Sequence, residues 1–403
     1  MDSNLQPPTS NFHNMRDVYI LGIGQTEVGE HWETSLRHLA LEAVEAALKD
    51  ANIKYPDAMY VGNMLAPQLS NQSHLGALIA DFCGLRGIEA VTVEAGNASG
   101  AAALRQAYIA VASGLIDSAM ALGVEKITDT VGSGVNAALA TMTDSDWEAA
   151  QGATPTTIAA LIMRRYMHEY GVTLRDFAGF SVNAHANAKT NPKAMFRNVI
   201  TPDAFAKAGM ICDPINMFDS APDADGAAAV ILIGADAVGA VGAKHASPLI
   251  RIAGSAVVTD AMAVHDRPDP LIFKSAKESA EKAFAQAGIG VSEMNVIELH
   301  DAYTVFAALS LEALGLADRG KGWELAQNGG ISLKGKTPIS TFGGLKARGN
   351  PGGATGLYQV VEVAMQLRGE AGANQVANAK RGLTQSLASS GATAVTHVLE
   401  RIG

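Results

Sequence analysis

Short runs of β-branched and aliphatic residues alternate with longer helical segments along almost the whole chain. Strands are expected at 18–24, 58–65, 90–96, 118–125, 225–238, 249–258, 295–301 and 390–401, and helices at 35–52, 99–115, 275–288 and 356–367. Strands that alternate with helices predict parallel sheets covered on both faces. The 41 glycines and only 5% aromatic residues fit an α/β protein with many tight turns and small-residue packing.

Two cycles of this alternation are visible, and they end alike. DGAAAVILIG (225–234) resembles SGATAVTHVLE (390–400), which indicates an internal duplication. The segment between the cycles is richer in polar and basic residues. We therefore expect a loose tail at 1–16, an N-terminal half made of 17–125 and 221–245, an inserted lobe at 126–220, and a C-terminal half at 246–403.

The formal charge of −10 and the lack of a basic block argue against binding to nucleic acid. Cys83 and Cys212 are too few for a disulfide framework and do not form a metal-binding pair, so no metal site is expected. The N-terminus has no apolar core of a signal peptide, and no run of 18 uncharged apolar residues occurs. These features predict a cytoplasmic protein that is not in a membrane.

The segment VEAGNASGAAALRQA (93–107) is a strand that stops at a glycine before an alanine-rich helix. Backbone N–H groups and the positive end of a helix dipole meet at such a turn. A cysteine there would be acidified and reactive. Asn97 stands at this position instead, and an amide offers hydrogen bonds but no useful nucleophile.

Basic residues of the inserted lobe have two readings. They are either solvated helix faces or a site for a phosphorylated ligand. The candidates are Arg164, Arg165, Lys189 and Arg197.

Four segments, taken in order and spacing, resemble the thiolase superfamily. They are GNASGAAAL (96–104), HDAYT (300–304), GGLKARGNPGGATGLYQ (343–359) and LTQSLASSGAT (383–393). The likeness is greatest to archaeal-type and sterol-carrier-linked (SCP2-like) thiolases, which carry a His-Asp motif where other thiolases have Asn-Glu-Ala-Phe. The resemblance implies two βαβαβ halves stacked in αβαβα layers, a lobe that holds coenzyme A as part of the substrate, no permanently bound cofactor, and at least a homodimer.

The resemblance also implies which catalytic groups this chain lacks. Asn97 replaces the nucleophilic cysteine, and Asn350 replaces the histidine of the Gly-His-Pro motif. Ser386 and Ala302 occupy the two positions at which family members carry the second cysteine. Removing a nucleophile or its base usually costs several orders of magnitude in rate.

Hydrogen-bond donors at the expected site remain. The resemblance makes His300 part of an oxyanion hole for a thioester enolate, while Asn97, Asn350 and the N–H groups of Gly349, Gly353 and Gly391 are further donors. Tyr303 stands where the family usually has phenylalanine. It is either a general acid, or a base if its pKa is lowered, or a core aromatic residue.

Three functions are compatible with these residues. The favoured one is carbon–carbon bond cleavage or formation on an acyl-CoA without an acyl-enzyme, of retro-aldol type on a 3-hydroxyacyl-CoA. The others are a non-catalytic subunit that scaffolds an acyl-CoA enzyme, and an acetyl-CoA C-acyltransferase with substituted active-site residues. The resemblance also implies a small OB-fold and zinc-ribbon (DUF35-type) protein as a possible partner.

Overall fold

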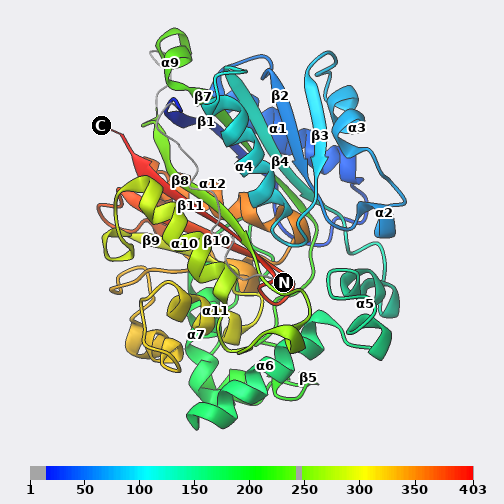
Figure 1. Ribbon diagram of the computed structural model, residues 1–403, viewed down its shortest axis with the longest axis vertical. Helices are drawn as coiled ribbons and strands as arrows, with labels where there is room; N and C mark the ends of the chain where they lie inside the picture. The colour runs from blue at the N-terminus through cyan, green and yellow to red at the C-terminus, as the bar shows by residue number, and fades with distance from the viewer. Residues whose placement is uncertain (1–14, 242–246, 403) are drawn as a thin grey trace, which may run out of the picture.

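Nine strands form one mixed sheet in the computed structural model, which describes residues 15–241 and 247–402 (Figure 1). The strand order is β3-β2-β4-β7-β1-β8-β11-β10-β9. The strands are β1 (Val18–Gln25), β2 (Ala58–Gly62), β3 (Glu89–Val93), β4 (Ser118–Glu125), β7 (Gly226–Gly234), β8 (Ile250–Thr259), β9 (Val296–Leu299), β10 (Arg381–Ala388) and β11 (Thr393–Arg401).

The two halves of this sheet repeat one topology, which confirms the expected duplication. In the first half β2 and β4 are parallel, and β7 then pairs antiparallel with both β4 and β1. In the second half β9 and β10 are parallel, and β11 pairs antiparallel with both β10 and β8. The similar segments DGAAAVILIG and SGATAVTHVLE thus contribute β7 and β11, which occupy equivalent positions.

Helices cover the sheet in layers (Figure 1). Helices α1 and α3 pack on the outer face of the first half, and α10 packs on the outer face of the second. Helices α4 and α12 lie between the halves and contact each other. Their bounds are α1 (Leu36–Ala51), α3 (Leu75–Phe82), α4 (Ser99–Ala112), α10 (Lys274–Ala287), α11 (Thr304–Ala313) and α12 (Thr355–Arg368).

Small residues allow the two central helices to approach closely. A Cβ on Gly356 would lie 2.6 Å from the backbone nitrogen of Ala101, and one on Gly100 would lie 2.8 Å from the carbonyl oxygen of Gly353. Any larger residue at these positions would force the helices apart. This contact sets the distance between the start of α4 and the loop before α12.

The expected lobe connects β4 to β7, and Figure 1 shows it below the sheet in teal and green. It contains short elements around a central helix. These are α5 (Ser133–Ala140), α6 (Pro155–Tyr170), α7 (Ala178–Ala188), α8 (Pro202–Ala206), β5 (Met210–Cys212) and β6 (Ile215–Asn216).

Several expectations need correction. The sheet is mixed and not parallel, because β7 and β11 run back against their neighbours. The segment 383–389, for which no strand was expected, is mostly strand β10, which ends at Ala388 before a short turn to β11. Residues 1–14 of the expected tail at 1–16 lie outside the described residues. Arg16, at its end, is anchored by an ion pair of 3.0 Å with Asp117. In the part of the chain that the structure describes, no helix is long and apolar enough to cross a membrane.

Candidate active site

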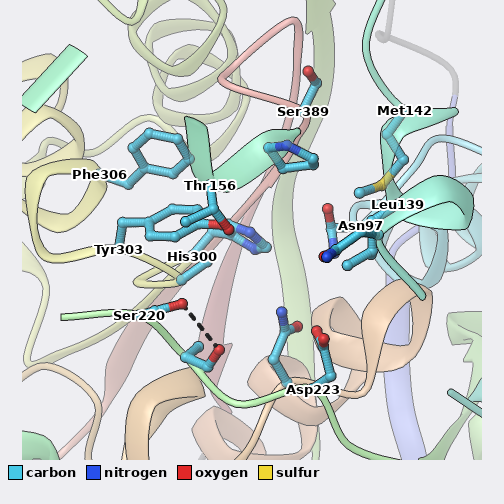
Figure 2. Close-up of a pocket in the computed structure, with 15 residues that line it drawn as sticks. Asn97, Leu139, Met142, Thr156, Ser220, Asp223, His300, Tyr303, Phe306 and Ser389 are labelled. Carbon is cyan, nitrogen blue, oxygen red and sulfur yellow. Dashed lines mark hydrogen bonds between the residues drawn. The ribbon is translucent and has the colours of Figure 1, made fainter. Parts of the chain in front are cut away.

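A cavity of about 90 Å³ lies where the two halves and the lobe meet (Figure 2). Its walls come from the start of α4, the loop after β9, the loop before α12, the turn after β10, the segment before β7, and helices α5 and α6 of the lobe. This volume is only a few times the roughly 30 Å³ that one water molecule occupies in the liquid. The cavity therefore fits the reacting end of a ligand, not a whole acyl-CoA.

His300 follows the buried strand β9 and reaches the cavity. Burial, together with the nearby positive charge of Arg348, lowers the pKa of the His300 ring to about 3. The ring is therefore neutral at physiological pH. Its Nδ1 is buried and has no hydrogen-bond partner in the described part of the chain. We assign the proton to Nε2, so that the neutral ring donates into the cavity through this nitrogen.

Arg348 is itself fixed below the cavity. Its guanidinium forms an ion pair of 2.9 Å with Glu362, and both side chains are 1% exposed. Lys346 from the same turn donates to the backbone carbonyl of Asp219. Asp301 accepts hydrogen bonds from Ser340 and from the backbone of this turn. The charges of the LKARG segment therefore hold loop structure together and do not line the cavity.

Asn350 has a fixed amide orientation. Its Oδ1 accepts a hydrogen bond of 3.0 Å from the hydroxyl of Thr355, the first residue of α12. The Nδ2 group is therefore left as the donor toward the cavity that Asn350 lines. Asn97 also lines the cavity and is 7% exposed, at the turn that opens α4.

Of the three glycines expected as donors, two already donate elsewhere. The N–H of Gly353 donates to Glu125 at 3.0 Å, and the N–H of Gly391 donates to the carbonyl of Ala388 at 3.2 Å. Neither of these N–H groups is available for an oxyanion. Gly349 is not among the lining residues and only gives the loop a positive φ of 110°.

Glu125, at the end of β4, holds the loop that carries Asn350. Besides Gly353, it accepts hydrogen bonds from the Asn63 side chain and from the backbone N–H groups of Met64 and Leu65. Burial raises the pKa of Glu125 to about 7, while these hydrogen bonds oppose the rise. Sequence reasoning missed this residue, because Glu125 and Gly353 are brought together only by the fold.

Tyr303 lines the cavity as expected, and its hydroxyl hydrogen-bonds to Thr156 at the start of α6 at 2.8 Å. Its ring packs edge-on against Phe306, with the ring centroids 5.1 Å apart. Burial raises the pKa of the Tyr303 phenol well above its usual value. The alternative in which a lowered pKa makes Tyr303 a base is therefore wrong, whereas its hydroxyl remains a possible donor.

Asp223 is the acidic residue that sequence reasoning missed. It lies in the segment before β7 and lines the cavity together with Ser220. Figure 2 shows the Asp223 carboxylate rising toward the space between His300 and Asn97. Asp223 is exposed to the open cavity, but the surrounding protein atoms desolvate its carboxyl and raise its pKa to about 6.

Ser386 does not reach the cavity. It is 1% exposed and donates to the side chain of Gln359 on α12 at 2.5 Å. Ser389, three residues further along, lines the cavity instead, as Figure 2 shows. Ala302, at the other second-cysteine position, is also a lining residue.

The four basic candidates do not form one cluster. Arg164 and Arg165 lie on α6 but pair with Asp213 and Glu169. Arg197 lines a separate open hollow of about 620 Å³ whose other charged residues are Glu27 and Glu30. Lys189 is exposed at the end of α7 and lines neither this hollow nor the cavity. The arrangement favours solvated faces for Arg164 and Arg165, as one of the two readings has it.

Neither cysteine supplies a nucleophile to the cavity. Cys83 ends α3, and burial, with a smaller effect of Glu45, raises the pKa of its thiol to about 11. Cys212 belongs to β5 and is likewise not a lining residue. The cavity therefore has no thiol among its walls.

The repeated topology and the cavity between the halves define a duplicated, layered α/β protein with its site where the halves meet. The chain belongs to the thiolase family: the thiolase N-terminal domain matches residues 18–236, and the thiolase C-terminal domain-like model matches residues 256–401. The expected family resemblance is thereby confirmed.

Individual relatives cover nearly the whole chain. Acetyl-CoA acetyltransferase of Methanothermobacter thermautotrophicus is 40% identical over 389 residues, which span 96% of this chain and 100% of the relative. Sterol carrier protein 2 of Gallus gallus is 31% identical over 396 residues, 94% of this chain and 71% of the relative. The solved structure of an Ltp2-ChsH2(DUF35) aldolase has a TM-score of 0.82 and 25% identity, and the match covers 96% of this chain and 98% of that one.

Proposed function

We propose that this protein makes or breaks a carbon–carbon bond in an acyl-CoA without forming an acyl-enzyme. Retro-aldol cleavage of a 3-hydroxyacyl-CoA is the direction we favour. One observation carries the proposal: the cavity has no thiol, yet a neutral His300 and the amides of Asn97 and Asn350 remain as donors. Such a site stabilises an enolate but cannot accept an acyl group.

The reaction uses these donors at one stage. When the bond between the α and β carbons breaks, negative charge develops on the thioester oxygen. The Nε2–H of His300 and the Nδ2–H of Asn350 donate to that oxygen, and Asn97 donates from the start of α4. Each donor of this kind typically contributes about 2.7–4 kcal/mol to the transition state.

Acyl transfer is the second candidate, favoured by the relative named acetyl-CoA acetyltransferase at 40% identity. One experiment separates the two functions. The purified protein is offered matched 3-hydroxyacyl-CoA and 3-oxoacyl-CoA compounds, with and without free coenzyme A, and products are identified by mass spectrometry. Cleavage of the hydroxyacyl compound to a carbonyl product without free coenzyme A is the expected result. Cleavage of the oxoacyl compound only with free coenzyme A would refute the proposal.

We also propose a small DUF35-type protein as a partner. The support is the 0.82 TM-score to a structure whose title names a DUF35 protein. Co-purification of the two proteins, followed by the same assay with and without the partner, tests this assignment. A protein that binds coenzyme A but turns over no substrate in either state would instead be a scaffold subunit.

A further inference from the structure

Asp223 is held rigidly between the loops that carry the proposed donors. The N–H of Asn350 donates to the carbonyl of Pro222 at 3.0 Å, and the N–H of Ala224 donates back to the carbonyl of Asn350 at 3.2 Å. The two neighbours of Asp223 are therefore both bonded to the residue that supplies one donor. The backbone that carries Asp223 is thereby fixed relative to Asn350.

The Asp223 carboxylate has no partner. Among residues 15–241 and 247–402, no side chain or backbone group hydrogen-bonds to it or forms an ion pair with it. Asp223 is exposed, whereas the buried carboxylates nearby are bonded at least in part: Glu125 has four donors and Asp219 accepts from Thr304. A carboxylate that faces a cavity and has no protein partner is available to a ligand.

Asp223 is also the one lining residue able to take up a proton near neutral pH. Of the 15 residues that line the cavity, only Asp223, His300 and Tyr303 titrate. His300 has a pKa of about 3 and is a weak base, and the raised pKa of Tyr303 keeps its phenol protonated. Asp223, with a pKa of about 6, is ionised at pH 7 and is still basic enough to accept a proton.

We propose that Asp223 is the general base of the reaction, and this inference rests on the proposed function. Its carboxylate takes the proton of the 3-hydroxyl, whose O–H electrons form the new carbonyl. The bond between the α and β carbons breaks, and its electron pair moves onto the thioester as an enolate. The protonated Asp223 then returns its proton to the α carbon. One carboxyl thus carries one proton from oxygen to carbon and ends as it began.

The first test replaces the carboxyl by an amide of the same shape. Asp223→Asn is expected to lower kcat for 3-hydroxyacyl-CoA cleavage by about 10²–10⁴-fold, the usual contribution of a general base. Coenzyme A binding, measured by calorimetry, should stay unchanged. Asp318→Asn, which alters an exposed carboxylate whose side chain is 86% accessible, is the matched control with full activity.

A second variant tests whether the rate is lost only because the substitution disturbs the structure of the site. In Asp223→Ala, added formate supplies a carboxylate that can enter the vacated space, and it should restore part of the lost rate. Formate should change neither the natural protein nor the Asp318→Asn control. Normal cleavage by Asp223→Asn, or an inactive Asp223→Ala that formate does not rescue, would overturn the assignment.

A third measurement separates this proposal from the function on which it rests. Exchange of the α-hydrogens of acetyl-CoA for deuterium in D₂O needs a base and an enolate site but breaks no carbon–carbon bond. One outcome would be that the natural protein exchanges these hydrogens, Asp223→Asn does not, and neither protein cleaves 3-hydroxyacyl-CoA. Asp223 would then still be the base, but the proposed retro-aldol function would be overturned. If the natural protein neither exchanges nor cleaves, both proposals are overturned.

Discussion

At the scale of single residues, the unpartnered carboxylate of Asp223 lowers the stability of the folded protein. The surrounding protein atoms desolvate the carboxyl and disfavour its charged form, and nothing in the described part of the chain compensates by pairing with it. Groups that carry function often reduce stability in this way. The donors opposite Asp223 are neutral, so the cavity as a whole lacks a cation to balance a bound enolate. Its charge must therefore be spread over hydrogen bonds from neutral groups.

This cost predicts how stability depends on pH. In the unfolded chain the carboxyl titrates near its ordinary value of 3.8, and in the folded protein its pKa is about 6. The folded state therefore binds the proton more tightly between these values, and the free energy of unfolding falls as pH rises through this window. Asp223→Asn should raise Tm relative to the natural protein at pH 7.5 and much less at pH 4. An equal Tm difference at both pH values would contradict this expectation.

His300 gives a second prediction. Because it donates as a neutral ring, His300→Ala should lower kcat by about 10²–10³-fold, the usual loss for one oxyanion donor. His300→Asn, which keeps a donor, should lose less. The pH–rate profile of the natural protein should show no step from His300 above pH 5, because its pKa is about 3.

The profile should instead rise through about pH 6 as Asp223 ionises. Glu125, with a pKa of about 7, lies behind the Asn350 loop and can add a second step. In Asp223→Asn the step near 6 should disappear from the residual rate, while a Glu125 step would stay. A step near pH 6 that persists in this variant would assign it to another group.

At this scale the sequence predicted part of the site. His300, Tyr303, Asn97 and Asn350 follow strand ends or glycine-rich turns, where cavities form in α/β proteins, and all four line the cavity. Asp223 gave no such signal, because it precedes β7 and enters the site only through the packing of three distant loops. The hydrogen bond from the Gly353 N–H to Glu125 could not be predicted either, because 228 residues separate the two.

At the scale of helices and strands, the close contact of α4 and α12 matters most for the site. Asn97 and Asn350 lie just before these helices, so the helix separation fixes how far apart the two amides stand. The sequence predicted both helices from their buried small residues. It did not predict β10, because QSLASSG reads as a turn unless its partner β11 is known to lie beside it.

Gly356→Ala tests this contact. The added Cβ would lie 2.6 Å from the backbone nitrogen of Ala101, which cannot move as a flexible side chain can. We expect a loss of about 1–3 kcal/mol in the free energy of unfolding, measured with denaturant, and a lower kcat. Gly239→Ala is the control, because nothing lies within 4 Å of its Cβ. A Gly356→Ala protein as stable and active as the control would contradict the role of this contact.

At the scale of the whole molecule, the two edges of the sheet differ. Strand β9 is buried, and its outer side is covered through a bridge between Ile297 and Ile339. Strand β3 at the other edge pairs only with β2 in the described part of the chain, and Val91 in it is 44% exposed. An open strand edge is a ready site for pairing with a second chain. The homodimer that the family resemblance implies is best explained by this edge.

Light scattering after size-exclusion chromatography should therefore give the mass of a dimer. Val91→Lys, which places a charge at the exposed edge, should shift the mass toward that of a monomer. Thr92→Lys, at an exposed position of the same strand, is a second variant that should also shift the mass toward that of a monomer. A natural protein that is monomeric, or two variants that remain dimeric, would show that β3 is not the interface.

The lobe leaves the sheet after Glu125 and rejoins it at Gly226, and these two residues are paired across β4 and β7. Its two ends therefore lie about 5 Å apart, the usual spacing of paired residues. A segment anchored in this way can lengthen, shorten or be replaced during evolution while the strands keep their register. Evolution can thus alter the acyl group that such a protein accepts by changing residues 126–220 alone, while Asp223, His300 and Asn350 stay in place in the two halves.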